Sequence, residues 1–430
     1  MGEDKDCRQR TPPTWKEREL YAFLWRAAFA LIFGAAYGWF SLKACREEAR
    51  VTALWREHTG LSWTAVKNAP HGRANATARE LVRLFSFEGA FHGPDGQRVW
   101  NNCMSILWEQ LQENRDEIAP LPDDVRDYLA VHRNDFLAMN QRIVSLPPVW
   151  SPFASGAALS RNRQAVKQYL YVAALYVLSA LGDGGRDQAL AWMEAMWRCG
   201  DCRQINSALL CALLLARLHD PPEEWQRRLA TPDDSRGLLS RRIAASAYAV
   251  MNDARETADI ANSFFDIPSV LPPLLKAAIA AAGRPYFRLC AADLAGISCQ
   301  AYLCAEAADA LEADLPPALE SVEHEALLNP LYPYGVHWSG YWRSIRRKEL
   351  KLESILKVIH VKGLWREAGK LPDALAPLAS SVCPQFHWEY VLESENSFSL
   401  TLDGKPSWVV EIRHGSAKEP IHTTWTVGTS

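Results

Sequence analysis

The chain has 430 residues, of which 48% are hydrophobic and 23% are charged, and its formal net charge is −3. This composition excludes a disordered chain, and the length allows one large helical array or two domains with substantial cores. The balanced charge argues against a nucleic-acid-binding protein, which needs a concentrated basic surface.

The segment from Leu20 to Leu42 is apolar and carries a single charge, Arg26. As a helix it would be about 35 Å long, against a hydrocarbon core of about 30 Å. Aromatic residues gather at its two ends: Trp15, Tyr21, Trp25, Tyr37, Trp39 and Phe40. Such rings favour the headgroup zone, whereas a soluble core helix is rarely apolar on every face. The sequence therefore predicts a single transmembrane anchor at 20–42 after a tail at 1–19.

Small residues recur every fourth position within this predicted span, at Ala30, Gly34 and Gly38. Small side chains on one face let two membrane helices approach closely. We therefore predict a homodimer that associates through these three residues. The short tail before the span and the large remainder after it favour a cytoplasmic tail and a body on the outer side.

Helical periodicity dominates the membrane-proximal region at 43–150. A helix is expected to leave the membrane at Arg46 to Trp63, and further helices are expected at Thr77 to Phe91, Val99 to Glu117 and Asp123 to Leu146. A break at 92–96, rich in Gly and Pro, separates the second from the third.

The region at 151–348 is interpreted as a helical-repeat body. Its best-defined unit runs from Ala165 to Arg198, where two amphipathic helices flank the glycine-rich turn at 182–185. This pattern describes an αα-hairpin of the tetratricopeptide type. Two related hairpins are expected at 207–229 and at 239–265, without a strict repeat period.

The chain has ten cysteines, of which Cys199 and Cys202 have the spacing of a redox or metal motif. They follow a helix rather than a strand, and no second pair lies at the distance of a zinc site. A local disulfide between them, or two buried thiols, is the favoured interpretation.

Two charged stretches are interpreted as solvated helix faces. The first is Glu323-His324-Glu325, whose adjacent side chains point apart on a helix, and the second is the basic run from Arg343 to Lys348. No motif for a nucleophile, a phosphate or a dinucleotide is present, so we predict no catalytic residues, no metal and no cofactor.

The segment at 332–343 is the most site-like, because it is an expected loop dense in aromatic rings. Its candidate ligand-binding residues are Tyr332, Tyr334, His337, Trp338, Tyr341, Trp342 and Arg343. Flat rings with polar edges suit a sugar or a peptide. The alternative is that these rings hold a long connection against the helical body.

The region at 349–430 is expected to contain a long helix and a small antiparallel sheet. Alternation of period two appears at Phe386 to Leu392, Ser397 to Leu402, Ser407 to Ile412 and His422 to Val427. Asp403-Gly404 is a hairpin signal, and the helix from Leu350 to Ala368 is the candidate to cover the sheet.

The segment Gly369-Lys370-Leu371-Pro372-Asp373-Ala374-Leu375-Ala376-Pro377-Leu378, after its long helix, resembles a segment of uncharacterised membrane-anchored proteins of environmental bacteria such as planctomycetes. The residues at 75–81 and 145–148 are similar to the same group. The helix-to-strand arrangement also resembles the back half of type II secretion pseudopilins. The resemblance implies a bacterial envelope protein with an N-terminal anchor, and it supplies no catalytic residues.

Together these patterns predict a mainly α protein of the bacterial inner membrane with a periplasmic body. We expect its helical-repeat surface to bind an unidentified protein as a non-catalytic scaffold. The alternative is an envelope enzyme, or a sugar- or peptide-binding protein, that uses the aromatic segment at 332–343.

Overall fold

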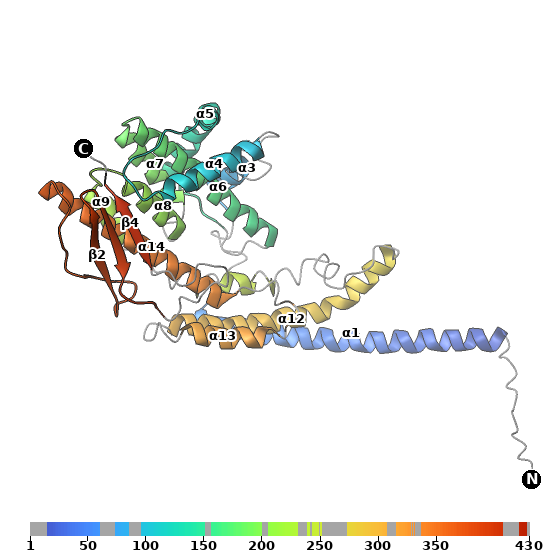
Figure 1. The fold of residues 1–430 in the computed structure, drawn as a ribbon. Coiled ribbons are helices and arrows are strands. Elements are labelled where there is room, and N and C mark those ends of the chain that lie inside the picture. The colour runs from blue at the N-terminus through green and yellow to red at the C-terminus, as the bar shows by residue number, and fades with distance from the viewer. Residues whose placement is uncertain are drawn as a thin grey trace, which may run out of the picture.

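The computed structural model describes residues 15–60, 74–85, 96–150, 156–199, 205–230, 239–240, 243–248, 250–251, 273–307, 315–327, 329, 331, 337–406 and 421–427. Over these ranges the chain is mainly helical and has one small antiparallel sheet, as predicted. Figure 1 shows a rod of long helices, a helical bundle to one side of it, and a long helix that carries the sheet.

Helix α1 (Trp15–Thr59) is one continuous helix with two different environments. Large apolar side chains are exposed throughout the predicted span, among them Phe23, Leu31 and Phe33. In the second half, by contrast, Val51 and Trp55 are fully buried. The first half is therefore a candidate membrane span, and the helix crosses the boundary predicted at residue 42.

Helix α12 (Pro273–Ala307) lies along the second half of α1 (Figure 1). The Trp55 indole Nε1 donates to the Ala295 carbonyl at 2.9 Å. Arg288 donates from Nε and Nη2 to the two Glu48 carboxylate oxygens at 2.8 and 2.9 Å. Tyr286 contacts Phe40 near the end of the predicted span. The two helices therefore run in the same direction, and α12 packs against the part of α1 that follows the predicted span.

Helix α6 (Gly156–Gly182) is the second helix long and apolar enough to cross a membrane. Most residues of its apolar stretch at 164–182 are buried inside the protein. It packs against several other helices of the bundle. We therefore interpret α6 as the core helix of the bundle.

The predicted hairpin is formed by α6 and α7 (Arg186–Cys199). Gly184 has φ +77°, a conformation that favours glycine, and the Gly185 amide donates to the Ala180 carbonyl at 2.7 Å. The helices and the turn between them are confirmed, whereas the tetratricopeptide type stays a prediction.

Three helices that precede α6 in the chain pack around it: α3 (Ala76–Phe85), α4 (Gly96–Gln112) and α5 (Asp123–Ser145). α5 is attached by buried tyrosines of α6. Tyr169 donates to the Asn140 Oδ1 and Tyr176 donates to the Leu129 carbonyl, both at 2.5 Å. These helices agree with the predicted periodicity, although α4 ends earlier than predicted, and residues 86–91 of the helix predicted at 77–91 lie outside the described residues.

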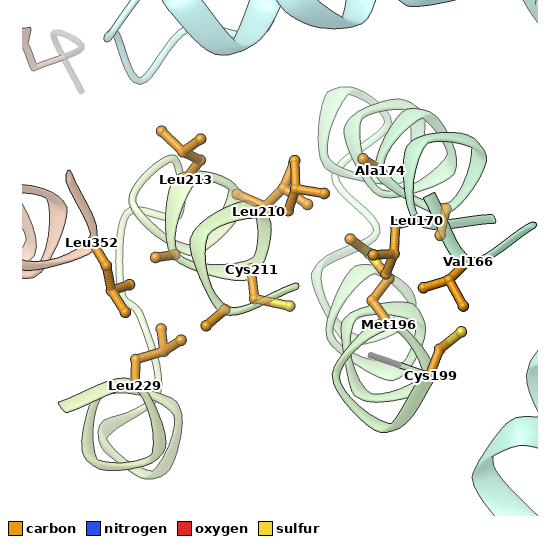
Figure 2. Close-up of a cluster of buried hydrophobic side chains, with 14 of the residues drawn as sticks. Val166, Leu170, Ala174, Met196, Cys199, Leu210, Cys211, Leu213, Leu229 and Leu352 are labelled. Atoms are coloured by element: carbon orange, nitrogen blue, oxygen red, sulfur yellow. The ribbon is translucent and has the colours of Figure 1, made fainter. Parts of the chain in front are cut away.

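Helix α8 (Ile205–Leu215) is apolar on every face and lies in the middle of the core. Figure 2 shows α8 between α6 and α7 on one side and, on the other, Leu229 of α9 (Glu223–Ala230) and Leu352 of the long C-terminal helix. Because both sides of α8 are covered, the bundle and the C-terminal part share one core.

That long helix, α14, runs from Trp338 to Ala368 and ends at Gly369, which has φ +69°. The predicted loop at 332–343 is therefore helical from residue 338, and the boundary predicted at 348 falls inside a helix. Glu323 on α13 (Leu315–Ala326) accepts hydrogen bonds from the Ser339 amide and hydroxyl at 2.7 and 2.8 Å. Glu323 is thus buried, and its carboxylate accepts from a main-chain amide that has no partner within the first turn of α14. Its interpretation as part of a solvated face is wrong.

The interpretation of the basic run as a solvated face is also wrong for Arg346. This side chain is buried and donates to the Glu349 carboxylate at 2.7 Å and to the Val382 carbonyl at 2.6 Å. The predicted periodicity missed this because the partner carbonyl belongs to a loop that follows α14 in the chain.

The sheet has the order β1-β2-β3-β4, with every neighbouring pair antiparallel. Its strands are Leu378–Ala379, His387–Ser394, Ser397–Leu402 and His422–Thr426. The turn at 395–396 joins β2 to β3, and β4 is the other neighbour of β3. The strand predicted at 407–412 lies outside the described residues.

Helix α14 covers the sheet, as predicted. Glu353 accepts hydrogen bonds from the Trp388 indole at 3.1 Å, from the Ser380 hydroxyl at 2.7 Å, and from Ser381. At the far edge, the Thr426 amide donates to the Asn114 carbonyl at 3.0 Å. The segment after α4 therefore extends the C-terminal sheet at β4.

Candidate functional site

Lys362 on α14 has no exposed surface and lies where the bundle meets the sheet. Its ammonium donates to the Asp116 Oδ1 at 2.6 Å, to the Ala216 carbonyl at 2.5 Å and to the Leu218 carbonyl at 3.1 Å. A lysine ammonium has three donors, so this group is fully satisfied. Burial lowers the pKa of Lys362, and the adjacent Asp116 carboxylate opposes that shift.

Asp116 connects three elements at this point. Besides Lys362 of α14, the Trp425 indole of β4 donates to its Oδ1 at 2.8 Å. The Asp116 amide itself donates to the Thr426 carbonyl at 3.1 Å. The Lys362 Nζ also lies 5.9 Å from the centre of the Trp425 ring. One carboxylate and one ammonium therefore tie α14, β4 and the segment after α4 together.

A cavity of about 340 Å³ opens beside this pair, between the turn after α6 and the end of α8. We call it the Arg217 pocket. Its lining residues are Asp116, Ile118, Leu181, Gly182, Gly184, Arg186, Arg217, Leu218 and His219. The volume is within the range of small-molecule sites, which begins at about 300 Å³.

Arg217 is the most constrained charge in this pocket, with an exposed fraction of 6%. Its guanidinium donates to the Gln110 carbonyl and, over 3.4 Å, to the Glu117 carbonyl. Its Nε has no hydrogen-bond partner. Among the described residues no carboxylate forms an ion pair with it, and burial lowers the pKa of Arg217 to about 10.

Arg186 also lines the pocket, and Arg366 is connected to Arg186 through Asp220. Arg186 donates to the Asp220 carbonyl at 2.6 Å, and its guanidinium lies 3.8 Å from the Asp220 carboxylate. Arg366 of α14 forms an ion pair with the same carboxylate. His219 packs its ring against Trp365. The lining of the pocket itself thus contains two arginines and one carboxylate, Asp116.

The structure places the predicted aromatic site differently. Trp338 and Trp342 are buried, so their rings fill the core rather than an exposed surface. His337 precedes α14, and Arg343 forms an ion pair with Glu320. Tyr341 is half-buried, whereas Tyr332 and Tyr334 lie outside the described residues. The ligand site at these seven residues stays a prediction, but the two tryptophans do not offer ring faces to it.

The other predicted residues are separated from this pocket. Cys199 is a buried free thiol, and Cys202 lies outside the described residues, so their bridge stays a prediction. Gly34 and Gly38 have open space where a side chain would be, as a free helix face requires. Within the described part of the chain, no three His, Cys, Asp or Glu side chains gather closely enough to hold a metal ion.

The prediction missed Lys362, Asp116 and Arg217. One signal was present for Lys362, because it follows Ile355 and Val358 by seven and four residues and so lies on their apolar face. No comparable pattern marks Asp116 or Arg217, because the contacts of each are made with residues distant in the sequence.

Comparisons of the chain with protein-family models, with curated proteins and with solved structures found no match. The assignment of function therefore rests on the residues and their geometry.

Proposed function

We propose that this protein is a single-pass protein of a bacterial inner membrane whose periplasmic body binds another protein as a non-catalytic scaffold. The observation that carries the proposal is α1. It joins an apolar, exposed first half to a buried second half without a break. Exposed rings and aliphatic side chains over the length of a bilayer are stable in lipid and costly in water.

A continuous helix suits a scaffold because it fixes the body relative to the membrane. Trp55 and Glu48 of α1 are hydrogen-bonded to α12. α12 in turn packs on α13, and α13 packs on α14. This chain of contacts supports a body held at a fixed distance and orientation, and a partner in the same envelope would meet a constant surface.

The proposed contact surface for this partner lies on the bundle that contains the hairpin of α6 and α7. We interpret that hairpin as a tetratricopeptide-like unit. Exposed apolar side chains gather near the C-terminal end of α5, at Val144, Leu146 and Val149, and we call them the α5 patch. Apolar residues grouped on a surface are typical of contacts with another protein.

The sugar- or peptide-binding alternative is weaker on geometry. It needs exposed ring faces at 332–343, and Trp338 and Trp342 are buried. The bacterial location follows from the resemblance of residues 369–378 to membrane-anchored envelope proteins, and it forms part of the proposal.

Membrane anchoring is tested by placing two lysines in the exposed apolar half of α1. Leu31→Lys combined with Phe33→Lys should release the protein from membranes washed with alkaline carbonate, because charges at the centre of a span are costly. Both side chains are exposed, so the fold of the body should be preserved. Val391→Lys, at an exposed site on β2, is the matched control and should stay in the membrane fraction.

The scaffold role is tested in cells with a photo-crosslinking amino acid. Placed at Leu146 in the α5 patch, it should give a discrete crosslinked product, which Val144→Lys in the same chain should weaken. Placed at the control position Val391, it should give none. Equal products from the two positions, or none from Leu146, would remove the α5 patch from the account.

A further inference from the structure

We propose that the Arg217 pocket binds a small oxyanion, a phosphate or carboxylate group, at a site independent of the scaffold surface. This inference goes beyond the proposed function, because it concerns a small-molecule ligand in the interior junction. It rests on a cavity, on an incompletely satisfied buried cation and on the balance of charge around them.

The buried cation is Arg217. A guanidinium has five N–H donors, yet the described residues offer it two main-chain carbonyls, at Gln110 and Glu117, and leave its Nε without a partner. A charge buried without a counter-ion is unfavourable. An oxyanion in the adjacent cavity would supply both the charge and the missing acceptors.

The surrounding charges favour an anion over a cation. Among the residues that line the pocket, Arg186 and Arg217 are cationic and Asp116 is the one carboxylate. Asp116 is already bound by Lys362 and Trp425, and Asp220 is shared by two arginines. Two carboxylates that flank Asp116 in the sequence, Glu113 and Glu117, form ion pairs with Arg115. Glu113 and Asp116 attract the Arg217 guanidinium at longer range, but among the described residues neither forms an ion pair with it.

The pocket is formed in advance of any ligand. The Arg217 guanidinium is held between carbonyls from the two ends of the segment at 110–117. The opposite wall is the turn after α6, where Gly182 and Gly184 carry no side chain and an added Cβ would meet nothing within 4 Å. A fixed cation facing an open main-chain wall reduces the ordering cost of binding a small anion.

The test uses the full chain in detergent, titrated calorimetrically with inorganic phosphate and, separately, with succinate at matched ionic strength. We expect saturable binding of one of them with a dissociation constant below about 10 mM. Arg217→Met should weaken it by about tenfold or more, because a charge-assisted bidentate contact is lost. Arg83→Met, which removes an exposed arginine on α3, should leave the affinity unchanged.

Circular dichroism shows whether Arg217→Met folds. If it does not, Arg186→Gln is the variant that tests the proposal. Arg186 is at the exposed rim, so its loss should preserve the fold and weaken binding by a few fold. Tighter binding of phosphate identifies a phosphoryl ligand, and tighter binding of succinate identifies a carboxylate ligand. Absence of saturable binding by the wild-type chain, or unchanged affinity in Arg186→Gln, would overturn the proposal.

Discussion

At the scale of single residues, the ion pair between Lys362 and Asp116 joins the helical bundle to α14 and the C-terminal sheet. The ammonium has three acceptors at distances of 2.5 to 3.1 Å, so its burial is compensated by hydrogen bonds as well as by charge. Removing one of the two charges leaves the other without its counter-ion inside the protein, which costs more than the pair itself contributes.

Lys362→Met should therefore lower the free energy of unfolding by about 3–5 kcal/mol. The thioether fills similar space but leaves two main-chain carbonyls without their donor and leaves Asp116 without its counter-ion, with the Trp425 indole still donating to it. Urea unfolding followed by circular dichroism measures the change. Lys370→Met is the matched control, because Lys370 is exposed and pairs with the exposed Asp373, and its loss should cost about 0–1 kcal/mol. Equal effects of the two substitutions would refute the role given to Lys362.

At the scale of elements, ion pairs join helices that are not adjacent in the sequence. Glu194 on α7 accepts hydrogen bonds from Arg198 on the same helix at 2.7 Å and from Arg228 on α9 at 2.6 Å. Burial alone would raise the pKa of Glu194, but the hydrogen bonds from Arg198 and Arg228 outweigh it, and the pKa is lowered from its ordinary value of 4.5.

This lowered pKa predicts a pH dependence of stability. The contribution of Glu194 should be fully present above pH 4.5, its unfolded value, and should disappear as the pH falls through the lower pKa of the folded state. The difference in unfolding free energy between wild type and Glu194→Gln should shrink over that window. Urea unfolding at a series of pH values measures it, and a difference that stays constant or grows toward acid pH contradicts the assignment.

The exposed stripe on α1 carries the predicted homodimer. Gly34→Ile should weaken self-association in the membrane, because a branched side chain on the stripe of Ala30, Gly34 and Gly38 keeps the two helices apart. Ala36→Ile, on the opposite face of the same helix, should leave it unchanged. Chemical crosslinking in membranes compares them, and full crosslinking of the Gly34→Ile chain would exclude this face as the dimer contact.

At the scale of the whole molecule, one buried cluster extends from Val51 of α1 to Val427 after β4. Elements with strong local patterns could be predicted, since the turn at 182–185 and the alternation in β3 each specify a local structure. The partners of those elements could not. Asp116 and Lys362 are separated by 246 residues, and periodicity along a chain contains no information on such a contact. The burial of Glu323 and Arg346 could not be predicted from the sequence for the same reason.

We propose that α1 spans the membrane and places the body on its outer side. Cys45, just after the predicted span, is an exposed free thiol, and Cys7 precedes the span in the sequence. The most direct measurement is labelling of intact spheroplasts with a membrane-impermeant maleimide, using Cys7→Ser and Cys45→Ser chains to separate the two thiols and the double variant as background.

We expect Cys45 to be labelled in intact spheroplasts and Cys7 to be labelled only after permeabilisation. Labelling of Cys45 only after permeabilisation would place the body in the cytoplasm, and equal labelling of both thiols in intact spheroplasts would show that α1 does not cross the membrane.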